Sequence, residues 1–179
     1  MKNLKKAAQK AKKIKLIATD IDGVLTDGKI IILESGEEIK EWDTCDRLAF
    51  TILRNHGKHL KIAWITGRKS KQVAARAREV GVHYLYQRCM NKLVAVKEIM
   101  NKENIKLDEV AFIGDDLLDL PVLSRCGFAV CPSNAVSEVK EAVDYIAKAA
   151  GGRGVFREVV ELIFKSQGLW KTVIQHYSS

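Results

Sequence analysis

The stretch IKLIATDIDGVLTDG, residues 14–28, decides how the rest of the chain is interpreted. Its apolar first half has the length of a buried strand and ends at two carboxylates, Asp20 and Asp22, with Gly23 directly after them. Ligands of open α/β sheets bind beyond the carboxyl ends of the strands, so we expect both aspartates at the mouth of a site. Gly23 would let the main chain approach a ligand closely.

Asp20 and Asp22 are too close for both to be charged in a partly dry site, unless a cation lies between them or one holds a proton. Both arrangements suit phosphoryl transfer. One carboxylate can attack phosphorus and form an aspartyl-phosphate, and the other can give a proton to the leaving oxygen and later take one from water. On its own, such a short motif is more often a solvated turn after a strand, so the rest of the chain has to decide.

The composition is typical of one globular domain, with 179 residues, 47% hydrophobic and 29% charged. No apolar stretch reaches membrane-spanning length and no signal-peptide pattern opens the chain, so we expect a cytoplasmic protein without membrane contact. The four cysteines are scattered and form no Cys-x-x-Cys pair. This spacing argues against a thiolate metal site and suits reduced thiols.

The net charge of +8 is concentrated at the start of the chain. Seven of the 30 basic residues lie within residues 1–15, which contain no acid, so 23 basic residues remain against 22 acidic ones. We expect residues 1–13 to form a basic arm, either a frayed leader or a short helix. Binding to nucleic acid is not expected, because no aromatic side chains lie among these lysines.

Strand and helix patterns alternate through residues 14–167, which predicts a single domain with a doubly wound, mainly parallel sheet and helices on both faces. Residues 29–42 form a predicted β-hairpin with a turn at Ser35-Gly36. The hairpin is too short to be a substrate-covering cap domain, and its apolar strand at 30–33 is expected to pack on another subunit. Residues 168–179 are expected to be a tail. Further strands are predicted at 60–65, 83–86, 110–113, 127–131 and 145–146.

Polar groups follow several of these strands, at ends that meet at one edge of the sheet. Their order matches what phosphoryl transfer requires: a nucleophile, an acid/base, phosphate donors, a cation and metal ligands. The groups beyond Asp20 and Asp22 are Thr66-Gly67-Arg68, Lys92, and Asp115 with Asp116 and Asp119.

These motifs resemble the haloacid dehalogenase superfamily of aspartate-dependent phosphatases over almost all of residues 14–167. The similarity is greatest to the small, capless 3-deoxy-D-manno-octulosonate 8-phosphate phosphatases. The glycine-rich segment before the last predicted helix is more specific than the general superfamily motifs. The segments that carry the resemblance are DIDGVLTDG at 20–28, ITGR at 65–68, YQ at 86–87, NKL at 91–93, GDDLLD at 114–119, GGRG at 151–154 and RE at 157–158.

The resemblance implies Mg²⁺-dependent hydrolysis of this phosphorylated sugar acid to the free sugar acid and phosphate, in lipopolysaccharide precursor synthesis. It further implies a homotetramer in which the hairpins assemble and a neighbouring chain helps to cover each site. The implied nucleophile is Asp20 and the implied acid/base is Asp22. Metal binding is implied for Asp20, Asp115 and the main-chain carbonyl of Asp22, with Asp116 or Asp119 supporting the metal ligands. The residues implied to bind phosphate or substrate are Thr66, Gly67, Arg68, Lys92, Asp46 and Arg153. Oxygen ligands alone fit Mg²⁺ better than zinc.

Two departures from the family pattern concern the substrate. Asp46-Arg47 and Gln87-Arg88 stand where relatives usually carry Asp-Gly and Gln-Gly. The arginines could bind a carboxylate or extra phosphate, block the usual sugar acid, or simply point to solvent.

Three other interpretations remain open. The first is a phosphatase for a nonulosonate 9-phosphate or another sugar phosphate, although Arg68 after Thr-Gly favours the octulosonate type. The second is a signalling receiver domain, in which the acidic pair would come before the phosphorylated aspartate, threonine and lysine; the order here favours the phosphatase. The third is a non-catalytic oligomeric domain, against which the complete set of Asp20, Asp22, Lys92 and Asp115 argues.

Overall fold

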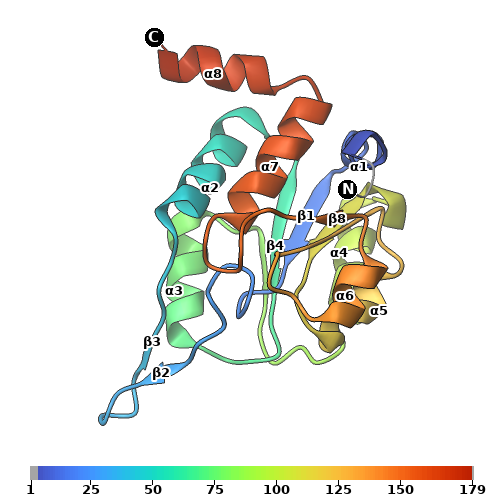
Figure 1. Ribbon diagram of the computed structural model, residues 1–179. Coiled ribbons are helices and arrows are strands. Elements are labelled where there is room, and N and C mark those ends of the chain that lie inside the picture. Colours follow the sequence, from blue (N-terminus) through green and yellow to red (C-terminus); the bar gives the residue numbers. More distant parts are fainter. Residues whose placement is uncertain (1–3, 179) are drawn as a thin grey trace.

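The computed structural model describes residues 4–178, so the first three residues of the basic arm and the last residue of the tail lie outside the described residues. A six-stranded parallel sheet forms the centre of the molecule (Figure 1). Its strand order is β5-β4-β1-β6-β7-β8. The strands are β1 (Leu16–Thr19), β4 (Lys61–Ile65), β5 (Tyr84–Tyr86), β6 (Val110–Ile113), β7 (Phe128–Cys131) and β8 (Tyr145–Ile146).

The chain moves outward from β1 through β4 to β5 and then crosses to β6 on the other side of β1. Thr19, the last residue of β1, pairs with Trp64 of β4 and with Ile113 of β6. The sheet therefore reverses its winding next to the carboxyl end of β1, which is where open α/β sheets bind their ligands. All four residues of β1 and of β6 are buried, as expected for central parallel strands.

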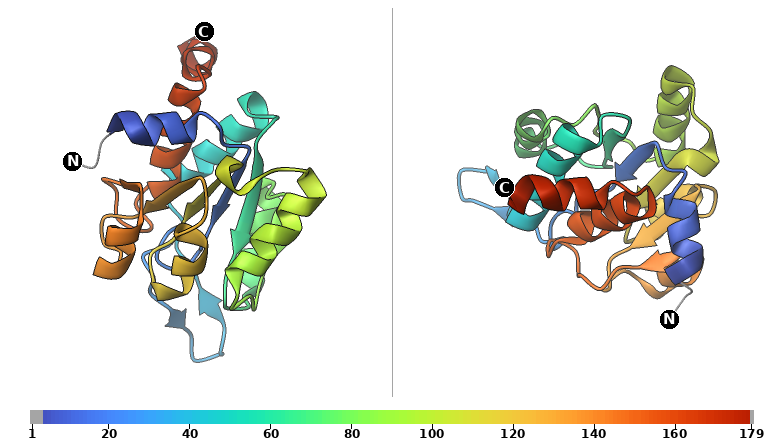
Figure 2. Two further views of the ribbon diagram at one scale, coloured as in Figure 1. Left: turned by 90° about the vertical axis from the view of Figure 1, so that its right-hand side faces the viewer. Right: turned by 90° about the horizontal axis from the view of Figure 1, so that it is seen from above.

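Helices cover both faces of the sheet (Figure 2), which confirms the predicted fold class. The two apolar layers are separate clusters of buried side chains. One face carries α1 (Leu4–Ala11), α2 (Thr44–His56), α3 (Lys71–Val80) and α7 (Val155–Ser166), with α8 (Trp170–Ser178) beside α7; the other carries α4 (Lys92–Glu103), α5 (Leu120–Leu123) and α6 (Ser137–Ala142). Short 3₁₀ turns at Leu107–Glu109 and Leu117–Asp119 flank β6.

The hairpin projects from the sheet edge below α3 (Figure 1), as a ribbon of β2 (Ile31–Ile32) and β3 (Glu38–Ile39) paired antiparallel. Its strands are shorter than the sequence pattern suggests. Between Leu33 and Glu37 a main-chain hydrogen bond of 2.8 Å closes the turn. The apolar side chains of this ribbon are exposed: Ile30 42%, Ile31 42%, Ile32 66% and Leu33 42%.

Both ends of the chain are more structured than their sequence suggests. Ala7 and Ala11 of α1 are buried, and α1 lies against α7 (Figure 2). Lys10 reaches Asp144 at 2.6 Å, so this part of the arm is a docked helix. Residues 170–178, expected as a tail, form α8, in which Val173 is buried.

Helix α2 is capped by Asp43, whose carboxylate accepts from the N–H of Cys45 at 2.6 Å. Ile52 and Leu53 of this helix are buried, whereas Leu48 is 38% exposed. In the described part of the chain no helix has the length and apolar character needed to cross a membrane.

Candidate active site

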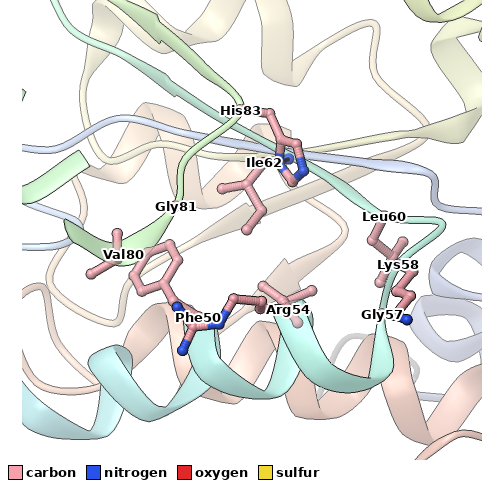
Figure 3. Close-up of a pocket in the computed structure, with 10 residues that line it drawn as sticks. Phe50, Arg54, Gly57, Lys58, Leu60, Ile62, Val80, Gly81 and His83 are labelled. Atoms are coloured by element: carbon pink, nitrogen blue, oxygen red, sulfur yellow. Dashed lines mark hydrogen bonds between the residues drawn. The ribbon is translucent and has the colours of Figure 1, made fainter. Parts of the chain in front are cut away.

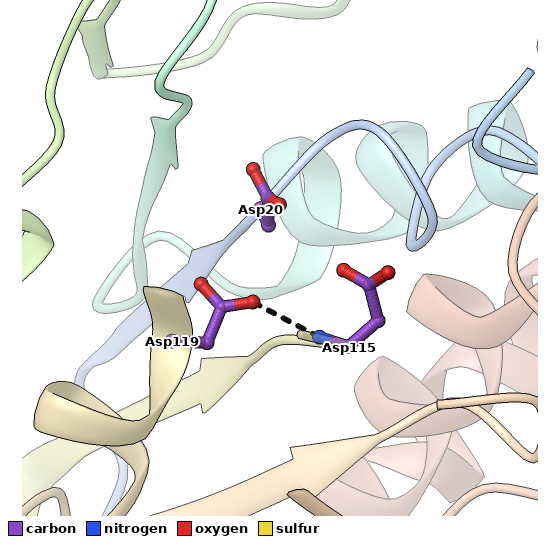
Figure 4. Close-up of side chains that lie close together, drawn as sticks. All are labelled: Asp20, Asp115 and Asp119. Atoms are coloured by element: carbon purple, nitrogen blue, oxygen red, sulfur yellow. Dashed lines mark hydrogen bonds between the residues drawn. The ribbon is translucent and has the colours of Figure 1, made fainter. Parts of the chain in front are cut away.

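Three carboxylates meet where β1 and β6 end (Figure 4). Asp20 directly follows β1, and its N–H donates to the carbonyl of Ile113 at 2.9 Å, which ties it to the end of β6. Asp115 follows β6 by two residues, and Asp119 ends the 3₁₀ turn after it. One oxygen of each of the three lies within 4.8 Å of the others.

This carboxylate cluster has the properties of a cation site. Burial raises the pKa of Asp20 to about 6, against the attraction of Lys92, with Asp119 adding to the rise. Burial, reinforced by Asp20 and Asp119, raises the pKa of Asp115 to about 7. Oδ1 of Asp115 is buried and has no hydrogen-bond partner among residues 4–178. A buried carboxylate oxygen without a hydrogen-bond partner is suited to binding a cation, and a site with only oxygen ligands suits Mg²⁺.

Lys92, the first residue of α4, is the cation that lies inside the cluster. Its side chain is 2% exposed, and Nζ lies 3.0 Å from Oδ1 of Asp20 and 2.6 Å from Oδ1 of Asp119. Burial lowers its pKa, but the two carboxylates outweigh burial and the net shift is upward, so the ammonium stays charged. It therefore offsets repulsion between an incoming phosphate and Asp20.

Asp119 has both oxygens engaged. Oδ1 pairs with Lys92, and Oδ2 accepts from the N–H groups of Asp115 at 3.0 Å and Asp116 at 3.4 Å. This arrangement fits the expected supporting role behind the metal ligands. Asp116 is exposed, and its carboxylate accepts from the N–H of Leu117 at 2.6 Å, so it caps the 3₁₀ turn rather than facing the cluster.

Two glycines are required by close packing at this edge. A Cβ on Gly23, whose φ is +97°, would lie 2.0 Å from Oδ2 of Asp115. A Cβ on Gly114 would lie 2.5 Å from the carboxylate of Asp119. Gly23 thus lets the loop after β1 approach Asp115, and Gly114 lets Asp119 fold back over the turn after β6.

Thr66 and Gly67 follow β4 beside the cluster. Thr66 is buried, and its Oγ1 accepts from the N–H of Arg68 at 3.2 Å, which leaves its hydroxyl hydrogen available to donate. Gly67 is partly exposed, and a Cβ there would lie 3.1 Å from Sδ of Met90. A hydroxyl and an open main-chain N–H at a strand end are suited to holding phosphate oxygens.

Asp22 has its carboxylate between two cations, outside the three-carboxylate cluster. Lys40 forms an ion pair with Oδ1 of Asp22, and Nε of Arg68 lies 3.7 Å from Oδ2. Glu38 binds both cations, at 3.0 Å from Lys40 and 2.7 Å from Arg68. Sequence reasoning missed Lys40 and Glu38. Their alternation, with Ile39 on the opposite side, was the available signal that both point to one face of the hairpin.

Asp46 is buried, with Oδ2 unpartnered among residues 4–178, and its contact with substrate stays a prediction. Its side chain is 4% exposed at the junction of α2 and α7, where Oδ1 accepts from the N–H of Arg157 at 2.8 Å. Burial raises its pKa to about 7. Arg153 is exposed and lines a cavity of about 260 Å³ together with Asp27, Trp42 and Gly152, at the rim of the site.

The two unusual arginines lie in different surroundings. Arg47 extends along the surface, with Nε 3.7 Å from Glu79 of α3, and both side chains are more than half exposed. Arg88 is exposed and has a φ of +55°, in the left-handed region that favours glycine. A glycine at this position would adopt the same main-chain conformation without strain.

A cavity of about 200 Å³ lies between the C-terminal ends of α2 and α3 (Figure 3). Phe50, Leu60 and Ile62 form its apolar wall, and Arg54 and His83 supply polar groups. It opens near the start of β4, whereas Asp20 and Thr66 lie beyond the strand ends. Since none of the described residues that line it carries a carboxylate, this cavity is separate from the candidate active site.

The arrangement can carry out phosphoryl transfer to a carboxylate. Asp20 supplies a nucleophilic oxygen, with Lys92 beside it to neutralise the incoming charge. The cluster of Asp20 and Asp115 can hold a divalent cation, and Asp22, two residues after Asp20, is a group that can give and take a proton.

Comparisons with known proteins point to the same chemistry. The model of the haloacid dehalogenase-like hydrolases matches residues 68–159. The 3-deoxy-D-manno-octulosonate 8-phosphate phosphatase KdsC of Escherichia coli K12 is 39% identical over 163 residues, which cover 89% of this chain and 84% of that protein. KdsC of Yersinia pestis is 36% identical over 159 residues, with the same coverage.

Solved structures agree over nearly the whole chain. The 3-deoxy-D-manno-octulosonate 8-phosphate phosphatase from Moraxella catarrhalis, in complex with magnesium, phosphate and KDO, has a TM-score of 0.94 and 38% identity, covering 98% of this chain and 99% of that one. The cobalt-bound enzyme from Haemophilus influenzae has a TM-score of 0.84 and 34% identity, covering 89% and 92%.

Proposed function

The chain belongs to the haloacid dehalogenase-like hydrolases and is a phosphatase, and we propose that it converts 3-deoxy-D-manno-octulosonate 8-phosphate to the free sugar acid and phosphate. The observation that carries the proposal is the Asp20–Lys92–Asp115 arrangement, in a chain whose fold matches an enzyme for this ester from end to end. The reaction would serve lipopolysaccharide precursor synthesis.

Mg²⁺ is the metal that the site fits. Asp20 and Asp115 would hold it with one carboxylate oxygen each, and the main-chain carbonyl of Asp22 would add a third ligand. The support for this set is the buried, unpartnered Oδ1 of Asp115 and the raised pKa values of both carboxyls, which bound Mg²⁺ would reverse. When bound, the ion orients the phosphate and neutralises charge that develops during transfer.

In the first half-reaction, a carboxylate oxygen of Asp20 attacks phosphorus and the bond from phosphorus to the ester oxygen breaks. The electron pair of that bond goes to the sugar oxygen, which takes a proton from Asp22 and leaves as the alcohol. Lys92 stabilises the aspartyl-phosphate. Thr66 and the N–H of Gly67 hold the transferring phosphoryl oxygens.

In the second half-reaction, the ionised carboxylate of Asp22 takes a proton from water as the water attacks the phosphorus of the aspartyl-phosphate. The bond from phosphorus to Asp20 breaks, phosphate forms, and the Asp20 carboxylate and the proton on Asp22 are restored. Arg68, beside Asp22, and Arg153, at the rim, are the side chains we assign to the sugar acid.

Assembly into a homotetramer and a cytoplasmic location complete the proposal. The hairpin exposes four consecutive apolar residues, from Ile30 to Leu33, which a second copy of the chain would cover. Such packing would also cover a site that has no cap domain of its own. None of the four cysteines forms a disulfide, which suits a reducing compartment.

The proposed function is tested by measuring phosphate release, with Mg²⁺ and with EDTA, from a panel of esters. The panel contains 3-deoxy-D-manno-octulosonate 8-phosphate, a nine-carbon sugar acid 9-phosphate, and arabinose 5-phosphate, which lacks the carboxylate. We expect Mg²⁺-dependent turnover with a clear preference for the first. A preference for another ester would overturn the substrate assignment, and turnover unaffected by EDTA would overturn the metal assignment.

A further inference from the structure

Lys40 is a buried cation on an otherwise exposed hairpin. Its side chain is 1% exposed, although its neighbour Ile39 is 42% exposed. The ammonium lies between Asp22, with which it pairs closely, and Glu38, whose Oε1 is 3.0 Å from Nζ. Taking an ammonium out of water costs several kcal/mol of desolvation unless carboxylates compensate it, so its burial at this point needs a reason.

Asp22 depends on these cations for its orientation. It lies in the loop after β1, and no main-chain N–H within residues 4–178 donates to its carboxylate. Its Oδ1 faces Lys40, and its Oδ2 faces Nε of Arg68 at a longer 3.7 Å. Arg68 also forms an ion pair with Glu38, in which Nη2 lies 2.7 Å from Oε2. Lys40 is therefore the close partner that fixes the side-chain torsions of Asp22.

We propose that Lys40 is a positioning residue for proton transfer by Asp22, an inference that rests on the phosphatase reaction proposed above. When the bond from phosphorus to the ester oxygen breaks, the proton of Asp22 passes to the sugar oxygen and the carboxylate becomes ionised. Lys40 holds that carboxylate in place between the two half-reactions. Glu38 keeps the ammonium in position between the two carboxylates.

A comparison of substrates with different leaving groups distinguishes a role in proton transfer from a purely structural role. An alkyl oxygen leaves poorly without a proton, whereas p-nitrophenolate is a stable anion and leaves without one. The quantity kcat/KM reports the steps up to departure of the alcohol, so it isolates the proton transfer to the leaving group. A structural defect in the site would lower kcat/KM for both kinds of ester alike.

The experiment compares kcat/KM of the wild-type and Lys40→Met proteins for the sugar-acid phosphate and for p-nitrophenyl phosphate. We expect the variant to lose roughly tenfold to a hundredfold on the alkyl ester and to stay within about twofold on the aryl ester, since a positioned acid is worth about 10²–10⁴-fold. The aryl activity also shows that the variant is folded and holds its metal.

Two variants serve as controls. Lys40→Arg keeps the charge near Asp22 and is expected to recover much of the alkyl activity. Lys29→Met removes a lysine from the segment leading into β2, at the same base of the hairpin, where it is 78% exposed and pairs with Asp27, and is expected to leave both activities unchanged.

Equal losses on the two esters in Lys40→Met, or a full alkyl activity, would overturn the inference while leaving the proposed function intact. A wild-type protein that hydrolyses neither ester would overturn the proposed function and the inference with it. The two failures are therefore distinguishable by the wild-type rates alone.

Discussion

Lys92 is the residue on which the charge balance of the active site depends. Within residues 4–178 it is the one ammonium in contact with Asp20, and it also binds Asp119, which orders the turn that carries Asp115. Its place at the start of α4 follows from the short connection after β5, which keeps the chain at the carboxyl edge of the sheet. A single buried cation thus links the nucleophile to the proposed metal ligands.

Arg88 offers a test of main-chain strain. An L-residue in the left-handed region costs about 1–2 kcal/mol, so we expect Arg88→Gly to raise the free energy of unfolding by up to about 1 kcal/mol after the greater flexibility of unfolded glycine is deducted. The matched change Arg47→Gly, within helix α2, should instead cost about 1 kcal/mol. Thermal unfolding of both variants measures this, and a destabilised Arg88→Gly protein would contradict the assigned strain.

Asp46 predicts a pH dependence of stability. Its pKa is about 7 in the folded protein and near 3.8 when unfolded, so between these values the folded state binds the extra proton. The contribution of Asp46 to stability is therefore greatest at low pH and is lost as the pH rises toward and through 7. An asparagine side chain at this position would accept the same N–H of Arg157 without ionising.

We accordingly expect the melting temperature of Asp46→Asn, relative to that of wild type, to be higher at pH 8 than at pH 5, because most of the loss in wild type falls between these pH values. Melting curves in EDTA at both pH values measure the difference. A relative melting temperature of the variant that is lower at pH 8 would show that the ionised carboxylate, attracted to the start of α7, is the favoured form.

At the scale of elements, the hairpin has two dissimilar faces. Ile31 and Ile39, which pair across the ribbon, are both 42% exposed on one face, whereas Glu38 and Lys40 on the other face lie at the charges around Asp22. A two-stranded ribbon of this length has little stability of its own. The hairpin is therefore stabilised by the ion pairs at its base and by the proposed contact with a second subunit.

The hairpin's assembly role is tested by Ile32→Glu. A charge in an apolar interface is costly, so we expect the variant to dissociate to smaller species in sedimentation velocity experiments. Leu4→Glu, on the exposed side of α1, serves as the matched control and should leave the assembly unchanged. An unchanged sedimentation coefficient for Ile32→Glu would contradict the proposed interface.

The elements that the sequence pattern misjudged share a physical cause. β1, β6 and α7 are bounded by sharp polar or glycine signals and are fully buried on one side, so their positions were predictable. The terminal helix α8 has only Val173 buried, and Trp170 packs under the cations of Arg157 and Lys165 at 5.3 and 5.7 Å. These contacts depend on how α8 turns back against α7, which the spacing of the apolar residues does not show.

At the scale of the whole molecule, motif order predicted which residues meet, but not how each is oriented. The strand ends bring Asp20, Lys92 and Asp115 together because parallel strands share one edge. Whether Asp46 faces substrate or the interior depends on the rotation of α2 against α7, which a sequence does not state. The inward side chains of the hairpin depend likewise on its fold-back geometry.

The central claim is that the phosphoryl group passes through Asp20. The most direct measurement is to treat the enzyme with borohydride during turnover of the sugar-acid phosphate in Mg²⁺, and to locate the reduced residue by peptide mass spectrometry. The account predicts reduction of Asp20 to homoserine, dependent on both substrate and Mg²⁺ and absent in Asp20→Asn. Reduction at Asp22 or Asp115 instead, or full turnover by Asp20→Asn, would contradict it.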